Sequence, residues 1–298
     1  MNLLTSSAAL AFILTFLLAV LPDAAAATLS LKPIADAGIM AGFPNNNLGA
    51  STNIASGGTS FQGAARVLLR FDLAAAIPRS AVIVSADLKM WVNKGNSLAP
   101  ASHFELHRLL VDWTEGSGSG LTGSSINEGE SSWNARVAPD VNWAAPGGRG
   151  GVDFASLPSA SVRVSLEGLQ TFQSAPALVA DLRSWLEDPA SNFGWMLLCA
   201  EEQTSLTARR FASREDSVNG PVLIVTYELP PADLKIGVVR SGNASILLSW
   251  SGARAPYQVQ RKADIAADWI NVEGPTGEQS RLLLTAGGAG YFRVISVP

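Results

Sequence analysis

The sequence predicts an all-β protein: a jelly-roll-like β-sandwich with one short helix, followed by a small second β-sandwich. Three observations predict this fold class. Short runs of alternating apolar and polar residues recur along the chain, separated by clusters of Gly, Pro, Asn and Ser. Apolar residues make up 47% of the chain and charged residues only 15%, so sizeable cores can form. One stretch alone has the apolar spacing of an amphipathic helix.

Residues 1–27 are predicted to be a signal peptide. A long apolar run ends in small residues, and Ala25-Ala26-Ala27 forms an A-x-A cleavage site that leaves Thr28 as the mature N-terminus. No Lys or Arg precedes the run, so an uncleaved membrane anchor is the alternative. No later stretch is long enough to span a bilayer. We therefore expect a secreted, extracellular protein (bacterial envelope or medium) that touches a membrane only if the signal is not cleaved.

Residues 28–228 are predicted to form the first sandwich. Eight short runs have strand character and are expected to pair as a jelly roll or a related double sheet. These runs are Thr28–Pro33, Arg66–Leu73, Val82–Val92, His103–Leu109, Ser161–Leu166, Gly194–Cys199, Thr207–Ser213 and Val222–Glu228. The Gly- and Ser-rich tract 116–151 is expected to be a loop folded over one end of the sandwich.

One helix is expected within residues 174–188. Its apolar residues recur at helical spacing, Ser174 is suited to the N-cap, and Pro189 ends the helix. The predicted buried face consists of Leu178, Leu182, Trp185 and Leu186. A single helix of this kind is expected to pack across the sandwich as a structural element.

The runs 66–73 and 82–92 each sort their side chains onto two faces, because side chains alternate along a strand. The apolar sets are predicted to face the core, whereas the opposite sets carry cations and an indole. If the strands pair side by side, one surface would collect Arg66, Arg70, Lys89, Trp91 and His107. Arginine binds carboxylates through two parallel hydrogen bonds, and a tryptophan face stacks on a sugar ring. These five residues are the predicted substrate-binding site.

An alternative for the same arginines is ordinary ion pairing. Arg66 and Arg70 would then bond to Asp87, Glu105 or Glu215 at the surface. Trp91 would be covered in that case by the helix or by the C-terminal module.

Four segments resemble, in order, one known family. They are DAGIMAGFPNNNLGASTNIASGG, RFDL followed by SADLKMWV, WLEDPASNFGWMLL, and FASREDSVNGPVLIVTY. They are similar to the DNRLRE-type module, which is also known as carbohydrate-binding module family 96, and they span residues 31–227. The resemblance implies binding of uronate polysaccharides such as alginate. It also implies that Trp113 and Trp133 match the W-T-E and S-W-N positions, where we expect them to anchor the loop.

Residues 229–233 are predicted to be a linker, since paired prolines cannot continue a central strand. Residues 234–298 contain strand-length runs at the spacing of a small sandwich, and the pattern resembles the fibronectin-type-III-like modules that end many secreted bacterial proteins. Trp250 and Trp269 are its predicted core aromatics.

Catalytic groups are few. His103 and His107 lie on one expected strand about 13 Å apart, too far to share a metal ion. The carboxylates available for glycoside hydrolysis are Asp112, Glu115, Glu128 and Glu130, which would have to approach one another across the long loop. Their alternative role is to solvate the loop or form turns, and we do not expect an enzyme.

No cofactor is expected to be required, but a structural calcium ion is one option. Asp36 and Asn45–Asn47 offer hard oxygen ligands of the kind that calcium takes. Turn formation explains the asparagines equally well.

Charge and cysteine content exclude other classes. Without residues 1–27 the chain has 21 basic and 24 acidic residues, far from the profile of a nucleic-acid binder. Cys199 is the only cysteine, so no intramolecular disulfide forms, and it is expected to be buried and inert. We expect a monomeric, secreted, non-catalytic binder of an acidic polysaccharide. The alternatives are a structural or adhesive surface protein without sugar binding and, less favoured, a polysaccharide lyase or hydrolase.

Overall fold

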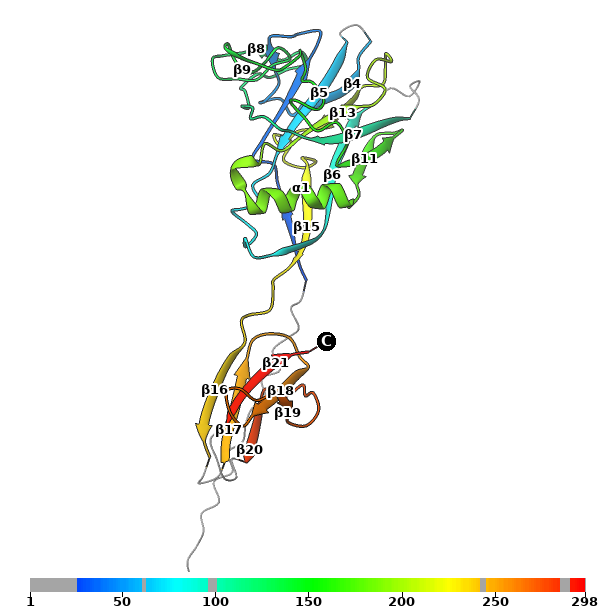
Figure 1. Ribbon diagram of the computed structural model, residues 1–298. Coiled ribbons are helices and arrows are strands. Elements are labelled where there is room, and N and C mark those ends of the chain that lie inside the picture. Colours follow the sequence, from blue (N-terminus) through cyan, green and yellow to red (C-terminus); the bar gives the residue numbers. More distant parts are fainter. Residues whose placement is uncertain (1–25, 61–62, 96–100, 242–244, 285–289, 298) are drawn as a thin grey trace, which may run out of the picture. The chain divides into compact units, whose positions relative to one another are not determined.

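The computed structural model describes residues 26–297, except 61–62, 96–100, 242–244 and 285–289. The described residues form two compact units, and the boundary between them in the chain lies between Pro230 and Pro231 (Figure 1). Residues 1–25 of the expected signal peptide lie outside the described residues.

The first unit is a curled antiparallel β-structure with two halves (Figure 1). The β6 half contains β1 (Ala27–Leu31), β15 (Val222–Glu228), β6 (Val82–Lys94), β12 (Gly168–Phe172) and β14 (Arg209–Ala212). The β5 half contains β2 (Ala35–Met40), β5 (Ala64–Arg70), β13 (Trp195–Cys199), β7 (Ser102–Arg108) and β11 (Ala160–Val164). Strand β4 (Asn53–Gly58) pairs with both β14 and β5 and so joins the halves. The predicted all-β sandwich is confirmed.

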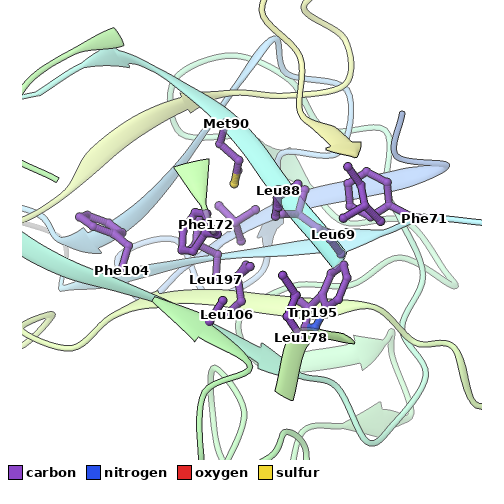
Figure 2. Close-up of a cluster of buried hydrophobic side chains, with 14 of the residues drawn as sticks. Leu69, Phe71, Leu88, Met90, Phe104, Leu106, Phe172, Leu178, Trp195 and Leu197 are labelled. Atoms are coloured by element: carbon purple, nitrogen blue, oxygen red, sulfur yellow. The ribbon is translucent and has the colours of Figure 1, made fainter. Parts of the chain in front are cut away.

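One hydrophobic core fills the space between the two halves. The register places Leu88 opposite Leu223 and Phe172, and Leu197 opposite Val67 and Leu106, so inward residues meet inward residues. Figure 2 shows side chains of both halves converging on this cluster: Leu88, Met90 and Phe172 from the β6 half, and Leu69, Phe104, Leu106, Trp195 and Leu197 from the β5 half. Each such side chain contributes about 1.5–3 kcal/mol by leaving water.

All eight expected strands are present, with small differences at their ends. The sequence did not predict β2, β4, β12 or the two-residue strand β3 (Asn46–Asn47). Strand β4 reads NIASGG and β2 reads ADAGIM, and both are rich in small residues that carry little strand signal. These strands form because neighbouring strands supply their hydrogen bonds.

The helix α1 spans Pro176–Glu187 and buries the predicted face. The predicted cap was wrong: Ala175 is the N-cap, and the Ser174 hydroxyl accepts a 3.0 Å hydrogen bond from the Ala86 backbone N–H instead. The helix ends before Pro189, which begins the short 3₁₀ helix η1 (Pro189–Ser191).

The tract 116–151 is mainly loop, as predicted. It contains only the short strands β8 (Ser124–Ser125), β9 (Ala135–Val137) and β10 (Val141–Asn142), and β8 pairs with β3 (Asn46–Asn47). A second apolar cluster joins this tract to the outward side of the β5 half, through residues Ala37, Ile39, Leu68, Leu109, Trp113, Trp143, Phe154, Met196 and Leu198.

The second unit is a small β-sandwich of two three-stranded sheets. One contains β16 (Lys235–Arg240), β17 (Ser245–Ser251) and β20 (Ser280–Leu284); the other contains β18 (Tyr257–Lys262), β19 (Ile270–Asn271) and β21 (Tyr291–Ser296). Trp250 is a core residue, as predicted. The prediction for Trp269 was wrong, because this ring is half-buried between the Arg293 guanidinium, 4.5 Å from its centroid, and Lys262.

Candidate functional site

Arg66 lies beneath the long loop rather than on an open surface. Its Nε and Nη2 atoms donate to both carboxylate oxygens of Glu202, at 3.1 and 2.5 Å, and Nη1 donates to the carbonyl oxygens of Gly147 and Gly148. The guanidinium also lies 5.4 Å from the ring centroid of Trp133. Its hydrogen-bonding capacity is therefore used within the fold.

Arg70 and His107 are likewise engaged. Arg70 donates to Asp112 Oδ1 at 3.1 Å and to the Trp113 carbonyl oxygen, and it stacks over the Trp113 ring at 4.9 Å. His107 is buried, and its Nδ1 donates to the Ala155 carbonyl oxygen at 2.8 Å. The expected ion-pair partners Asp87, Glu105 and Glu215 were wrong for both arginines. Asp112, in the segment directly after β7, pairs with Arg70, and Glu202, in the β13–β14 connection, pairs with Arg66.

Trp113 and Trp133 anchor the loop to the sandwich, as the resemblance implied. Trp113 is buried and its indole N–H donates to the Phe193 carbonyl oxygen at 2.8 Å. Trp133 is half-buried against Arg66 and Gly147. The loop therefore closes over the outward side of β5.

Lys89 and Trp91 lie elsewhere, so the predicted single surface was wrong. Met90, which lies between Lys89 and Trp91, points into the shared core, and so do Val67 and Leu69, which lie between Arg66 and Arg70. Strands β5 and β6 do not pair with each other but belong to opposite halves, so their outward side chains leave the sandwich on different sides. The structure brings together Arg66, Arg70 and His107 on one side, and Lys89 and Trp91 on the other.

The outward side of the β6 half carries a different set of cations. Arg210 of β14 pairs with Lys94 of β6 beside a β-bulge and with Ala55 of β4, and all three line one cleft. Asn93 donates to Asn53 Oδ1 at 2.8 Å, which connects β6 to β4. We name the set Asn53, Lys89, Trp91, Asn93, Lys94 and Arg210 the β6 face.

Unlike Arg66 and Arg70, the cations of the β6 face have no acidic partner. Within the described part of the chain, Lys89, Lys94 and Arg210 form no ion pair and no side-chain hydrogen bond. Trp91 is 38% exposed beside Leu169, which is 52% exposed. Positive charge and an aromatic surface are thus available to a ligand here.

A cleft of about 680 Å³ lies at the Lys94–Arg210 end of the β6 face. Its lining combines these cations with hydroxyl, amide and apolar side chains: Met40, Leu48, Ser51, Thr52, Asn53, Ile54, Thr59, Ser60, Lys94, Ser119, Leu121, Thr122, Leu206, Arg209 and Arg210. The volume is in the range of small-ligand sites. The sequence reading missed this cleft, since its walls come from four distant segments whose approach no local pattern signals.

Arg209, which precedes Arg210, points inward and is fully buried. Its Nη1 donates to the Thr207 carbonyl oxygen at 2.9 Å, and burial lowers the pKa of its guanidinium. This residue supports the wall of the cleft from behind.

The four carboxylates considered for catalysis have separate hydrogen-bonding partners or lie in solvent. Asp112 bonds to Arg70, and Glu115 bonds to Arg214 through Oε1 at 2.7 Å. Burial alone would raise the pKa of Glu130, but hydrogen bonds from Asn127 and Ser117 outweigh it and lower the pKa. Glu128 is exposed.

Asp36 is fully buried, but its neighbours differ from those expected. The asparagines bond to the long loop; Asn47, for example, donates to the Ser131 carbonyl oxygen at 2.7 Å. The acidic side chains beside Asp36 are Glu115 and Glu215. Burial, opposed by the hydrogen bond from Arg214, raises the Asp36 pKa to about 8.

Cys199 is buried, as predicted, and burial raises the pKa of its thiol to about 11.

No protein-family model matches the chain, and a search of curated proteins finds no match. Among the described residues, no helix has the length and apolar character needed to cross a membrane.

Proposed function

We propose that the chain is a secreted, monomeric, non-catalytic carbohydrate-binding protein that holds an acidic, uronate-type polysaccharide on the β6 face. Four ordered segments that resemble the DNRLRE-type module support this proposal, as does the fibronectin-type-III-like pattern of the C-terminal unit. The site differs from the one that the sequence predicted, because Arg66, Arg70 and His107 serve the fold.

The observation that carries the proposal is the pair Lys94 and Arg210. They pair with each other on the wall of a cleft, and among the described residues neither forms an ion pair. The Glu167 carboxylate accepts a 3.1 Å hydrogen bond from the backbone N–H of Gly95, next to Lys94. The guanidinium of an arginine can donate two parallel hydrogen bonds to a carboxylate, and a lysine beside it adds a second positive charge. A uronate residue presents one carboxylate and several hydroxyls, which match the cations and the Ser, Thr and Asn side chains of the cleft.

Trp91 and Lys89 continue the same face along β6. A polysaccharide extends over several sugar units, so it needs contacts beyond one cleft. The half-exposed indole supplies an apolar surface for the C–H side of a ring, and Lys89 supplies charge two residues away on the same side of the strand.

The test is binding of the full mature chain to alginate and to neutral glucans by affinity electrophoresis and titration calorimetry. We expect retardation by alginate that weakens with salt. Lys94→Ala and Arg210→Ala should each weaken binding by about tenfold, equivalent to about 1.4 kcal/mol. The matched control is Arg163→Ala, which removes an exposed cation from β11 of the other half. Equal binding by wild type, K94A and R210A would contradict the proposed site.

A structural or adhesive role is the second candidate. That role predicts that Arg66 and Arg70 pair with carboxylates, and they do. It also predicts that Trp91 is buried, but Trp91 is 38% exposed. Folded protein that is not retarded by any polysaccharide would favour this candidate. Incubation with alginate, followed by assays for reducing ends and unsaturated products, tests the lyase or hydrolase alternative in the same preparation.

A further inference from the structure

Three acidic side chains from distant parts of the first unit converge on one point. Asp36 belongs to β2, Glu115 begins the long loop, and Glu215 lies in the turn after β14. One carboxylate oxygen from each lies within 4.8 Å of the others. None of these residues belongs to the β6 face, so the proposal for this acidic cluster does not rest on polysaccharide binding.

The cluster contains a buried carboxylate oxygen without a hydrogen-bond partner, which distinguishes it from a group of solvent-exposed acids. Asp36 has 0% exposure, its Oδ2 accepts a 2.7 Å hydrogen bond from the Arg214 backbone N–H, and its Oδ1 has no partner in the described chain. Glu215 Oε2 is also buried and without a described partner. Buried carboxylate oxygens without a donor are costly, so most are paired or bind a metal.

The net charge of the cluster is suited to a divalent cation. Arg214 donates to both oxygens of Glu115, at 2.7 and 2.9 Å, and its Nε lies 3.1 Å from Glu215 Oε1. With Asp36 deprotonated, as it must be to bind a cation, the three carboxylates and one guanidinium have a net charge of −2. One divalent cation neutralises it.

The ligand chemistry favours calcium over magnesium. Calcium takes about six to eight oxygen ligands in flexible geometry, and protein carboxylates are prominent among them. Magnesium demands near-ideal octahedral geometry and usually keeps several of its waters, so it is bound through only one or two carboxylates. Three carboxylates from three separate segments, with one oxygen of each within 4.8 Å of the others, form the carboxylate-rich set that calcium takes.

We propose that Asp36, Glu115 and Glu215 form a calcium site, with Asp36 Oδ1 and Glu215 Oε2 as ligands and Glu115 held in place by Arg214. Calcium there ties β2, the start of the long loop and the turn after β14 together. The loop beyond Glu115 supplies Ser119, Leu121 and Thr122 to the cleft, so the ion also fixes one cleft wall.

The test uses the full mature chain, freed of metal by chelation, and follows thermal unfolding with added CaCl₂ or MgCl₂. At about 100 times its dissociation constant, calcium should raise the melting temperature of the first unit by about 5 °C. Magnesium should have a smaller effect. Terbium, which replaces calcium, should show luminescence sensitised by Trp113, two residues from Glu115 in the chain.

Variants make the test specific. Asp36→Asn removes the buried carboxylate ligand and should abolish both the calcium shift and the terbium signal. Glu215→Gln provides the same test if D36N does not fold. Glu128→Gln is the matched control, because it removes an exposed charge of the same loop and should leave both signals intact. A wild-type chain that neither shifts with calcium nor sensitises terbium overturns the proposal. Equal calcium shifts in the wild type and in E215Q or D36N also overturn it.

Discussion

Arg66→Ala is expected to destabilise the first unit severely. The side chain is only 14% exposed and its partner Glu202 only 10%. Removal of Arg66 leaves the Glu202 carboxylate and the Gly147 and Gly148 carbonyl oxygens without their donor beneath the loop. It also removes the contact with the Trp133 ring.

The magnitude can be worked out from these losses. Removing one partner of a buried ion pair costs about 3–5 kcal/mol, because the remaining charge stays buried and uncompensated. A typical urea slope of about 3 kcal/mol/M for a unit of this size converts this loss to a fall of about 1–1.7 M in the midpoint.

The assay is urea unfolding of the full mature chain followed by tryptophan fluorescence. Six of the eight tryptophans belong to the first unit, so its transition dominates the signal. Lys89→Ala is the control, because Lys89 has no described partner, and it should change stability by less than about 0.5 kcal/mol. A loss below about 1 kcal/mol in R66A would refute the reasoning and make Arg66 a candidate for ligand binding again.

Three further predictions concern the loop and the core. Gly147→Ala should lower the free energy of unfolding, measured by heat or urea, by about 1–3 kcal/mol, since φ is +82° and the new Cβ would lie 2.5 Å from the Trp133 ring. Gly129→Ala is the control, because Gly129 also has a positive φ but no atom lies within 4 Å of its Cβ position, so the loss should be smaller. Equal losses would contradict the steric argument. Cys199 should not react with a thiol reagent at pH 8 until the chain is denatured, because its pKa is about 11; rapid reaction of folded protein would show an open site. The Glu130 pKa is lowered in the folded state, so its contribution to stability is present above pH 4.5 and is lost as pH falls toward the folded pKa. Glu130→Gln should flatten this acid dependence in unfolding measured from pH 7 to 3, and an unchanged slope would contradict it.

The candidate site shows how far pattern reasoning reached. Alternation along 66–73 and 82–92 correctly separated the core side chains from the outward ones. It did not reveal that the two strands lie in opposite halves, because alternation fixes only the two faces of a single strand. The sequence therefore placed Arg66 and Lys89 on one surface, whereas the structure places them on different sides.

The sequence by itself determined the all-β class, the inward faces of the strands and the buried face of the helix. These features depend on local periodicity and on side chains that are too apolar to remain in water. Only the tertiary structure decided which outward side chains are covered. Arg66 meets Glu202 from 136 residues away, and the cleft and the Asp36 cluster each join segments that are distant in the chain. Such meetings depend on long-range strand pairing, for which a single sequence carries no local signal.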